Sequence, residues 1–257
     1  MLFSEPPRSQ GDLNFSLFGF PVRVHPFFWL VAVLLCSRQL FKAPGLREAL
    51  LVLLPWVSAV FLSILCHELG HAFVMRAYGF RPWITLHGFG GLASYDPSAS
   101  YGSKGNSPLA QILISFAGPG AGFLLAAVVV GAIKLAGYKI VFALGGPLGI
   151  VFGMEEIGSA AFTDFLWDVL FISFIWGAVN LLPVYPLDGG RISHEVLLTI
   201  SPRNGIRQSL ILSIFTAAAL AVVGLVRMQS VFVALMFGYL AFTSFQALQA
   251  YSDRRSW

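Results

Sequence analysis

The stretch FLSILCHELGHAFVMRAYGF, residues 61–80, carries His67, Glu68 and His71 inside a run that is otherwise apolar enough for the interior of a bilayer. Ionisable side chains are costly at that depth, and spanning helices rarely keep them without a function. Residues i and i+4 share one helix face with Cβ atoms about 5–6 Å apart, so both imidazoles can reach one Zn²⁺. A pair of packed histidines beside a hydrogen-bonded glutamate is the alternative, and it leaves the cost unexplained. The stretch therefore predicts a metal site inside a membrane-spanning helix.

Glu68 is offset by one position from the row that the two histidines share. A carboxylate placed there suits a group that takes a proton from water beside the metal, rather than a metal ligand. Cys66 precedes His67 and points about 100° away from it on a helix, so we interpret it as a core residue. A catalytic zinc usually has three protein ligands, and this helix supplies two.

Asp188 is the strongest candidate for the third ligand. It lies in NLLPVYPLDGGR, residues 180–191, at the end of an apolar run. Two prolines interrupt a regular helix there, and Gly189 and Gly190 permit tight turns, so the segment can fold back and direct a carboxylate at a buried metal. A turn carboxylate at the membrane interface is an equally good interpretation on these grounds alone. Asp164 and Asp168 are interpreted as solvated groups in or beside a loop, and His194 and Glu195 as solvated groups at the start of a helix. His25 and His87 lie in strand-like segments and are interpreted as partly solvated histidines, with a structural or gating role as the alternative.

The composition fits a polytopic membrane protein. Of the 257 residues, 57% are hydrophobic and only 11% are charged, against about 25% charged in a soluble domain. Apolar runs predict about six spans, near residues 26–40, 50–77, 109–135, 162–182, 209–226 and 231–251. We expect a single domain over residues 1–257, with the HELGH sequence on the second span and LDGG at the end of the fourth. The net charge of +4 comes without any basic run carrying interleaved aromatics, so we expect no nucleic-acid partner.

HELGH on one span and LDGG at the end of a later span, taken together, resemble the site-2 protease family of intramembrane zinc metalloproteases. The resemblance extends to GFPVRVHPFF near the start, to ITLHGFGGLASY, and to SFAGPGAGFLLA in the third span. It implies that His67, His71 and Asp188 bind one zinc ion per chain and that Glu68 is the general base. It also implies that Asn180 lies near the site and helps to hold or polarise substrate. The chain would be a minimal form of the family, without PDZ or CBS domains.

A short β-hairpin is expected between the second and third spans. From Ile84 to Tyr95, β-branched and aromatic residues alternate and are interrupted by glycines, and residues 21–25 form a second strand-like core that could pair with them. A locally unwound substrate could add to this hairpin as a strand, with Gly90 and Gly91 permitting close backbone approach. The alternative is that the hairpin only closes the interface as a structural plug. The glycine-rich residues 137–161 are expected to form a loop.

The expected fold class is an all-α polytopic membrane protein with a small sheet at the interface. The expected function is zinc-dependent hydrolysis of a peptide bond within or near the transmembrane segment of single-span membrane proteins in a lipid bilayer. Its regulation would fall to an unidentified membrane protein. Lys and Arg number ten on one side against six on the other, which favours a cell-membrane protein whose N-terminus and site opening are cytoplasmic. Two rivals stay open: a surface metalloprotease whose third ligand is a Glu from another helix, and a permease that passes an ion along buried His, Glu and Asp.

Overall fold

The computed structural model describes residues 5–88, 90–96, 103–143 and 151–255. These residues form two compact units. Among the described residues, the first unit takes those within 5–96, 117–143 and 151–177, and the second takes those within 103–116 and 178–255. The prediction of a single domain over the whole chain stays a prediction.

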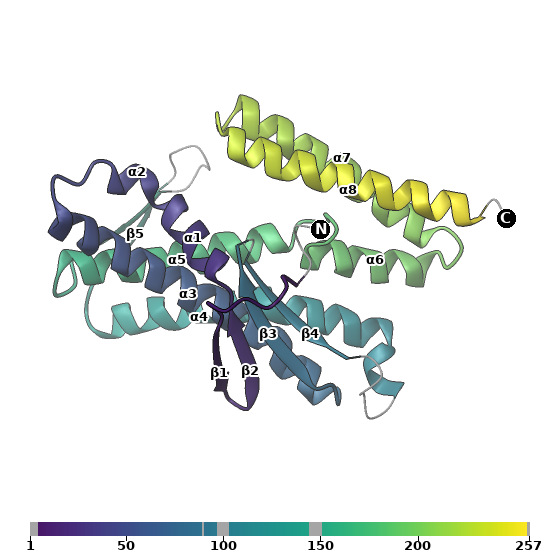
Figure 1. Cartoon of the computed structure of the whole chain (residues 1–257), viewed down its shortest axis with the longest axis horizontal. Coiled ribbons are helices and arrows are strands. Elements are labelled where there is room, and N and C mark those ends of the chain that lie inside the picture. The colour runs from purple at the N-terminus through teal and green to yellow at the C-terminus, as the bar shows by residue number, and fades with distance from the viewer. Residues whose placement is uncertain (1–4, 89, 97–102, 144–150, 256–257) are drawn as a thin grey trace. The chain divides into compact units, whose positions relative to one another are not determined.

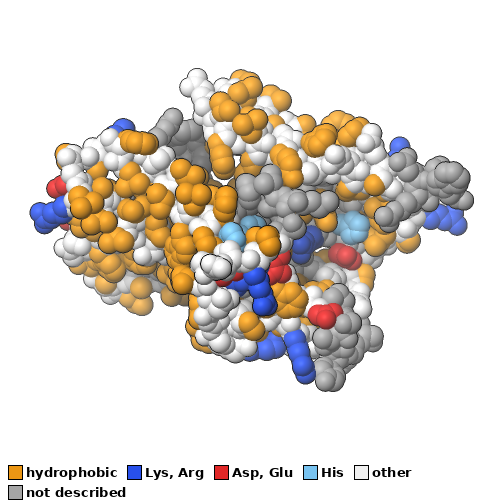
Figure 2. Space-filling model, in the orientation of Figure 1, with side chains coloured by type: hydrophobic (Ala, Val, Ile, Leu, Met, Phe, Trp, Pro, Cys, Tyr) orange, Lys and Arg blue, Asp and Glu red, His pale blue; other side chains and the backbone are white. Residues whose placement is uncertain are grey.

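Five helices in the described residues are long and apolar enough to cross a bilayer. They are α3 (Leu46–Ala77), α4 (Pro108–Leu135), α5 (Ala160–Asn180), α7 (Gly205–Val226) and α8 (Val231–Arg255). They coincide with five of the predicted spans, and hydrophobic side chains cover much of the visible surface over the long helices (Figure 2). The chain is therefore a multi-pass membrane protein with the all-α fold class that the sequence predicted.

The first predicted span is shorter than expected. Residues 26–40 form two helices, α1 (Pro26–Leu35) and α2 (Ser37–Leu40). The 10 residues of α1 rise only about 15 Å, half of the roughly 30 Å of hydrocarbon. Its start is fixed locally, because Pro26 stands in the first turn and the His25 side chain accepts a hydrogen bond from the Phe27 N–H at 3.2 Å.

A four-stranded sheet lies beside these helices in the first unit (Figure 1). Its strands are β1 (Leu13–Leu17), β2 (Phe20–Val24), β3 (Pro82–His87) and β4 (Gly90–Tyr95), in the order β1-β2-β3-β4. The two hairpins are antiparallel, while β2 and β3 run parallel with Val22 opposite Ile84. Both the predicted hairpin and its predicted pairing with residues 21–25 are confirmed.

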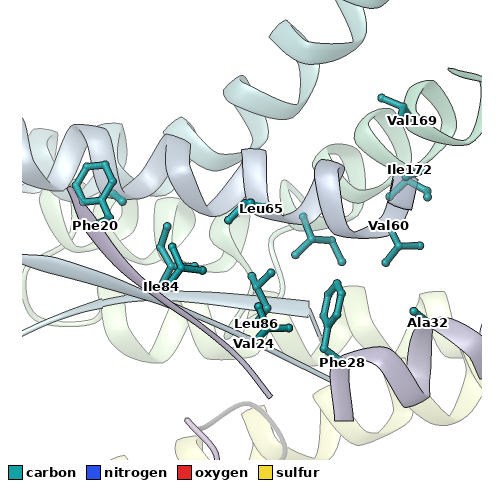
Figure 3. Close-up of a cluster of buried hydrophobic side chains, with 14 residues drawn as sticks. Phe20, Val24, Phe28, Ala32, Val60, Leu65, Ile84, Leu86, Val169 and Ile172 are labelled. Atoms are coloured by element: carbon teal, nitrogen blue, oxygen red, sulfur yellow. The ribbon is translucent and has the colours of Figure 1, made fainter. Parts of the chain in front are cut away.

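One face of this sheet packs on α3 and forms the core of the first unit (Figure 3). Phe20 and Val24 of β2 and Ile84 and Leu86 of β3 are all buried, as the period of two residues in a strand requires when one face is covered. Leu65 of α3 belongs to the same cluster. The core thus holds the sheet against the helix that carries the two histidines.

Residues 5–12, which we call the N-terminal strap, are tied to the opposite face of the sheet. The Arg23 guanidinium contacts Glu5 at 2.8 Å and Asp12 at 3.1 Å, and the Thr85 hydroxyl donates a hydrogen bond to Glu5 at 2.8 Å. Hydrogen bonds from Ser9, together with the Arg23 contact, lower the pKa of Asp12 to about 2. Burial alone would raise the pKa of Glu5, but the hydrogen bonds that it accepts outweigh burial and lower it.

The expected loop at residues 137–161 is wrong in part. Two strands, β5 (Ile140–Ala143) and β6 (Val151–Met154), pair antiparallel there, and residues 144–150 of that prediction lie outside the described residues. The apolar residues 140–143 are a strand signal that the surrounding glycines obscured.

The second unit contains η2 (Ser103–Asn106), the first turns of α4, and the helices α6 (Asp188–Ile200), α7 and α8. α7 and α8 run side by side as an antiparallel pair (Figure 1). Gly224 lies against Val233 near the turn that joins them, where a Cβ would approach the valine side chain at 2.7 Å. This close approach lets the two helices reverse direction within a few residues.

Candidate metal centre

His67 and His71 bring their Nε2 atoms to 3.2 Å of one another on α3. Both side chains are buried, and their rings stand nearly perpendicular at 76° with centroids 4.9 Å apart. Two nitrogens that bind one zinc at about 2.0–2.1 Å in a tetrahedral arrangement lie roughly 3.3 Å apart, so the observed separation fits a shared metal. The pair therefore satisfies the geometry that the spacing of four residues predicted.

Glu68 is buried beside this pair and faces the sheet. A Cβ built on Gly91 of β4 would stand 2.5 Å from its Oε1 and 2.6 Å from its Cδ, closer than real Cβ contacts. The carboxylate therefore occupies the space that any side chain at position 91 would need. The start of β4 is in contact with the predicted general base.

One glycine of α4, Gly118, faces the histidine pair of α3. A Cβ on Gly118 would overlap Nε2 of His71 and would stand 2.7 Å from Nε2 of His67. On α3 itself, Gly70 faces the Ala117 carbonyl and the Ala121 side chain of α4 too closely for a Cβ. The two helices thus approach through backbone, and the space in front of the imidazoles stays open.

α5 supports the same region from another side. Trp176 lies against Gly90, whose φ of +116° is already unfavourable for a side chain, and an added Cβ would overlap the indole. Ser173 of α5 donates a hydrogen bond to Ser63 of α3 at 3.1 Å, and both hydroxyls are buried. These contacts hold α5 against the histidine helix and the start of β4.

Asn180 and Asp188 both belong to the second unit and lie at helix ends. Asn180 is the last residue of α5, and Asp188 is the first residue of α6. Between them the chain turns back sharply, because Gly189 packs against the backbone of Leu181 and Gly190 against the backbone of Val184, where no Cβ fits. Gly189 and Gly190 lie in the first turn of α6, and the turn itself is formed by the residues between Asn180 and Asp188. The roles of Asp188 and Asn180 stay predictions.

Three of the groups interpreted as solvated lie in helices or strands of the structure. Asp164 and Asp168 belong to α5 rather than to a loop, and Asp168 is partly buried on that helix. His87 is buried on β3, and burial together with the nearby His25 and Arg23 lowers its pKa. The strand position of His87 is as predicted and its burial is not, whereas the exposed Asp164 differs from the prediction only in lying on a helix.

Sequence reasoning did not assign two residues that the structure places at the site. Gly118 faces the imidazole pair from α4, and Trp176 covers Gly90 from α5. The only signal for Gly118 was the run of small residues in SFAGPGAGF, which indicates close helix packing. Nothing local distinguishes Trp176 from the other aromatics.

A long helix with an interior His–Glu–His cluster in a multi-pass fold is an arrangement typical of membrane metallopeptidases. Comparison with known proteins agrees: the family model described as Peptidase family M50 matches residues 56–224, more than half of the chain. The chain belongs to peptidase family M50. Relatives that the chain resembles are named zinc metalloproteases.

Individual relatives support the same assignment. A zinc metalloprotease of Methanocaldococcus jannaschii is 27% identical over 184 residues, which are 71% of this chain and 44% of that protein. Stage IV sporulation protein FB of Bacillus subtilis is 30% identical over 173 residues, 66% of this chain and 46% of that protein. The chain thus spans less than half the length of these relatives.

A solved structure, the site-2 protease from Methanocaldococcus jannaschii, has the same fold. It matches with a TM-score of 0.56 and 20% sequence identity, over 92% of this chain and 95% of that one. The fold class that the sequence implied is therefore found in an experimental structure.

Proposed function

We propose that this chain is an intramembrane endopeptidase that cleaves membrane-protein substrates within or near a transmembrane segment. In this proposal His67, His71 and Asp188 hold one zinc ion, and Glu68 is the general base. The observation that carries it is the 3.2 Å separation of the two Nε2 atoms, with the buried Glu68 on the same helix. An imidazole pair and one carboxylate are a donor set of hydrolytic zinc sites, and such sites use a separate carboxylate as the general base.

The chemistry follows from the positions of the chain's own groups. Bound zinc would supply a Lewis acid that polarises the scissile carbonyl and acidifies water. Glu68 accepts a proton from the attacking water and delivers it to the leaving amide nitrogen, so it must be able to change its protonation state. Gly118 and Gly91 keep two volumes clear, one in front of the imidazoles and one beside the carboxylate.

The depth of Glu68 favours a substrate inside the bilayer. Glu68 lies nine residues before Ala77, the last residue of α3, which is about 14 Å along the helix axis. A scissile bond at this depth belongs to a spanning segment rather than to a soluble tail. Water must therefore enter from one face, which we propose is the cytoplasmic face, with the N-terminus on the same side.

Substrate binding by strand addition is the second part of the proposal. A helical substrate keeps its carbonyls in internal hydrogen bonds, so it must unwind before one of them is attacked. Among the described strands, β4 stands at the end of the sheet order, and its Gly90 and Gly91 lie next to Trp176 and Glu68. An extended substrate that pairs with β4 would recover its hydrogen bonds beside the base. Asn180 would then orient the substrate backbone.

The test is cleavage of a single-span model substrate by the purified chain in lipid vesicles, with zinc measured on the same samples. Glu68→Gln keeps the shape of the side chain and should retain zinc while activity falls by several orders of magnitude. Asp188→Ala should lose zinc. An unchanged zinc content in Asp188→Ala would favour a surface metalloprotease whose third ligand is a Glu from another helix. Zinc transport into vesicles by Glu68→Gln would favour a permease.

A further inference from the structure

The β1–β2 hairpin exposes apolar side chains where a soluble hairpin would be polar. Leu13 is 55% exposed, Phe15 is 40% exposed and Phe18 is 64% exposed. Leu13 and Phe15 alternate with Asn14 and Ser16, which are also exposed, so the strand has one apolar and one polar face. The apolar face continues the core face of the sheet, because Phe15 pairs with the buried Val22.

The turn of this hairpin carries an aromatic in an unfavourable conformation. Phe18 has φ of 52° and Gly19 has φ of 81°, and two-residue hairpin turns with both angles positive strongly prefer Asn-Gly or Asp-Gly. A bulky residue at positive φ is uncommon, and here most of its surface faces outward. Folding of the hairpin does not call for Phe18, so a contact outside the chain is the better explanation.

Arg76 locks the turn to the end of a spanning helix. Its guanidinium donates a hydrogen bond to the Phe18 carbonyl at 2.8 Å and stands 4.2 Å from the Phe20 ring centroid. Arg76 belongs to the last turn of α3, and the exposed Phe73 of α3 contacts Phe18 with centroids 5.7 Å apart. The hairpin turn therefore lies beside the C-terminal end of α3, and its apolar face is continuous with the exposed Phe73 of that candidate span.

We propose that the β1–β2 hairpin is an interfacial anchor that inserts Leu13, Phe15 and Phe18 into the lipid bilayer. An arginine beside exposed aromatics at the end of a spanning helix is typical of the membrane interface, where the charge reaches the headgroups and the rings reach the acyl chains. Asn14 and Ser16, on the other face, stay in water. The anchor fixes β1 at one end of the sheet order while β4, at the other end, contacts Glu68.

The test measures depth directly and does not depend on protease activity. Nitroxide labels are placed on Phe15→Cys and Phe18→Cys, with Asn14→Cys and Ser16→Cys as matched controls, in a background without the two native cysteines. The proteins are reconstituted into vesicles of phosphatidylcholine and phosphatidylglycerol, and collisions with oxygen and with a water-soluble nickel chelate are compared. Labels at 15 and 18 should have an oxygen-to-nickel accessibility ratio several-fold above that of the controls. Equal ratios at all four sites would overturn the proposal.

A second variant separates insertion from hairpin folding. Phe18→Asn places a residue preferred at positive φ in the turn, so the hairpin should remain folded while its deepest apolar group is lost. A label on Phe15→Cys should then become more accessible to nickel, and an unchanged ratio would argue against anchoring. Dipolar broadening between labels of different chains would indicate that a second copy, rather than lipid, covers β1, and would also overturn the proposal.

Discussion

Replacing Gly91 by alanine should disable the base while leaving the metal in place. The added Cβ would stand 2.5 Å from Oε1 and 2.6 Å from Cδ of Glu68, whereas ordinary contacts of this kind begin near 3.4 Å. The carboxylate must therefore move by roughly 0.9 Å, and a misplacement of about 1 Å can cost on the order of 10²-fold in rate. That loss corresponds to about 2.7 kcal/mol of transition-state stabilisation.

The assay is initial-rate cleavage of a single-span substrate in vesicles, with zinc content and thermal unfolding measured in parallel. Gly131→Ala is the matched control, because Gly131 lies on α4 with nothing within 4 Å of its Cβ position. The control should keep full activity, and its helix should gain up to about 1 kcal/mol of stability. If Gly91→Ala cleaves within two-fold of the unsubstituted chain while holding zinc, then Glu68 is not the base or its position does not matter.

Three further outcomes follow from the same structure. Gly118→Ala should lose zinc and activity together, because its Cβ would occupy the space in front of the imidazoles. The measurement is the zinc content of the purified variant, and full zinc occupancy would contradict the proposed position of the metal. Glu68→Gln and Asp188→Ala should differ in metal analysis, the first retaining zinc and the second losing it; equal occupancy would refute the assigned roles. The N-terminal strap should loosen in acid. Glu5 and Asp12 have folded pKa values below their ordinary 4.5 and 3.8, so their stabilisation is present above about pH 4.5 and is lost as the pH falls towards 2. Hydrogen–deuterium exchange of residues 5–12, expressed as protection relative to the intrinsic exchange rate at each pH, should show this loss. The strap of Glu5→Gln/Asp12→Asn should have protection that does not change with pH, and protection in the unsubstituted chain that does not fall in acid would refute the prediction.

The spans were predictable because each is a long apolar run, and hydrocarbon thickness sets the required length. Residues 26–40 are the exception among the predicted spans. Their apolar composition predicted one spanning helix, but the helix that starts at Pro26 has only ten residues and ends at Leu35. The hairpin at residues 82–95 was also predictable, since its alternation is regular. The strands at 140–143 and 151–154 were missed because four residues give too little alternation to outweigh the glycines around them.

The histidine pair and Glu68 were predictable because their relation is local: a helix fixes which faces residues 67, 68 and 71 occupy. Gly118 and Trp176 were not, because their importance depends on which helix packs against α3 and at what register. Local spacing carries no such information. Asp188 stands between these cases, since its glycine pair predicts a reversal of the chain but does not determine where the carboxylate points.

The glycines around the histidine helix perform different tasks, although each is simply a missing side chain. Gly70 lets the backbone of α4 approach α3, so a side chain there would push the helices apart. Gly118 leaves room in front of the imidazoles, where a side chain would compete with a ligand, and Gly91 leaves room for the Glu68 carboxylate. Each substitution should therefore fail in its own measurement: unfolding for Gly70, zinc content for Gly118, and turnover with zinc bound for Gly91. A single common failure in all three variants would mean that the region responds as one packed unit, and that metal binding and proton transfer are not separately adjustable in this fold.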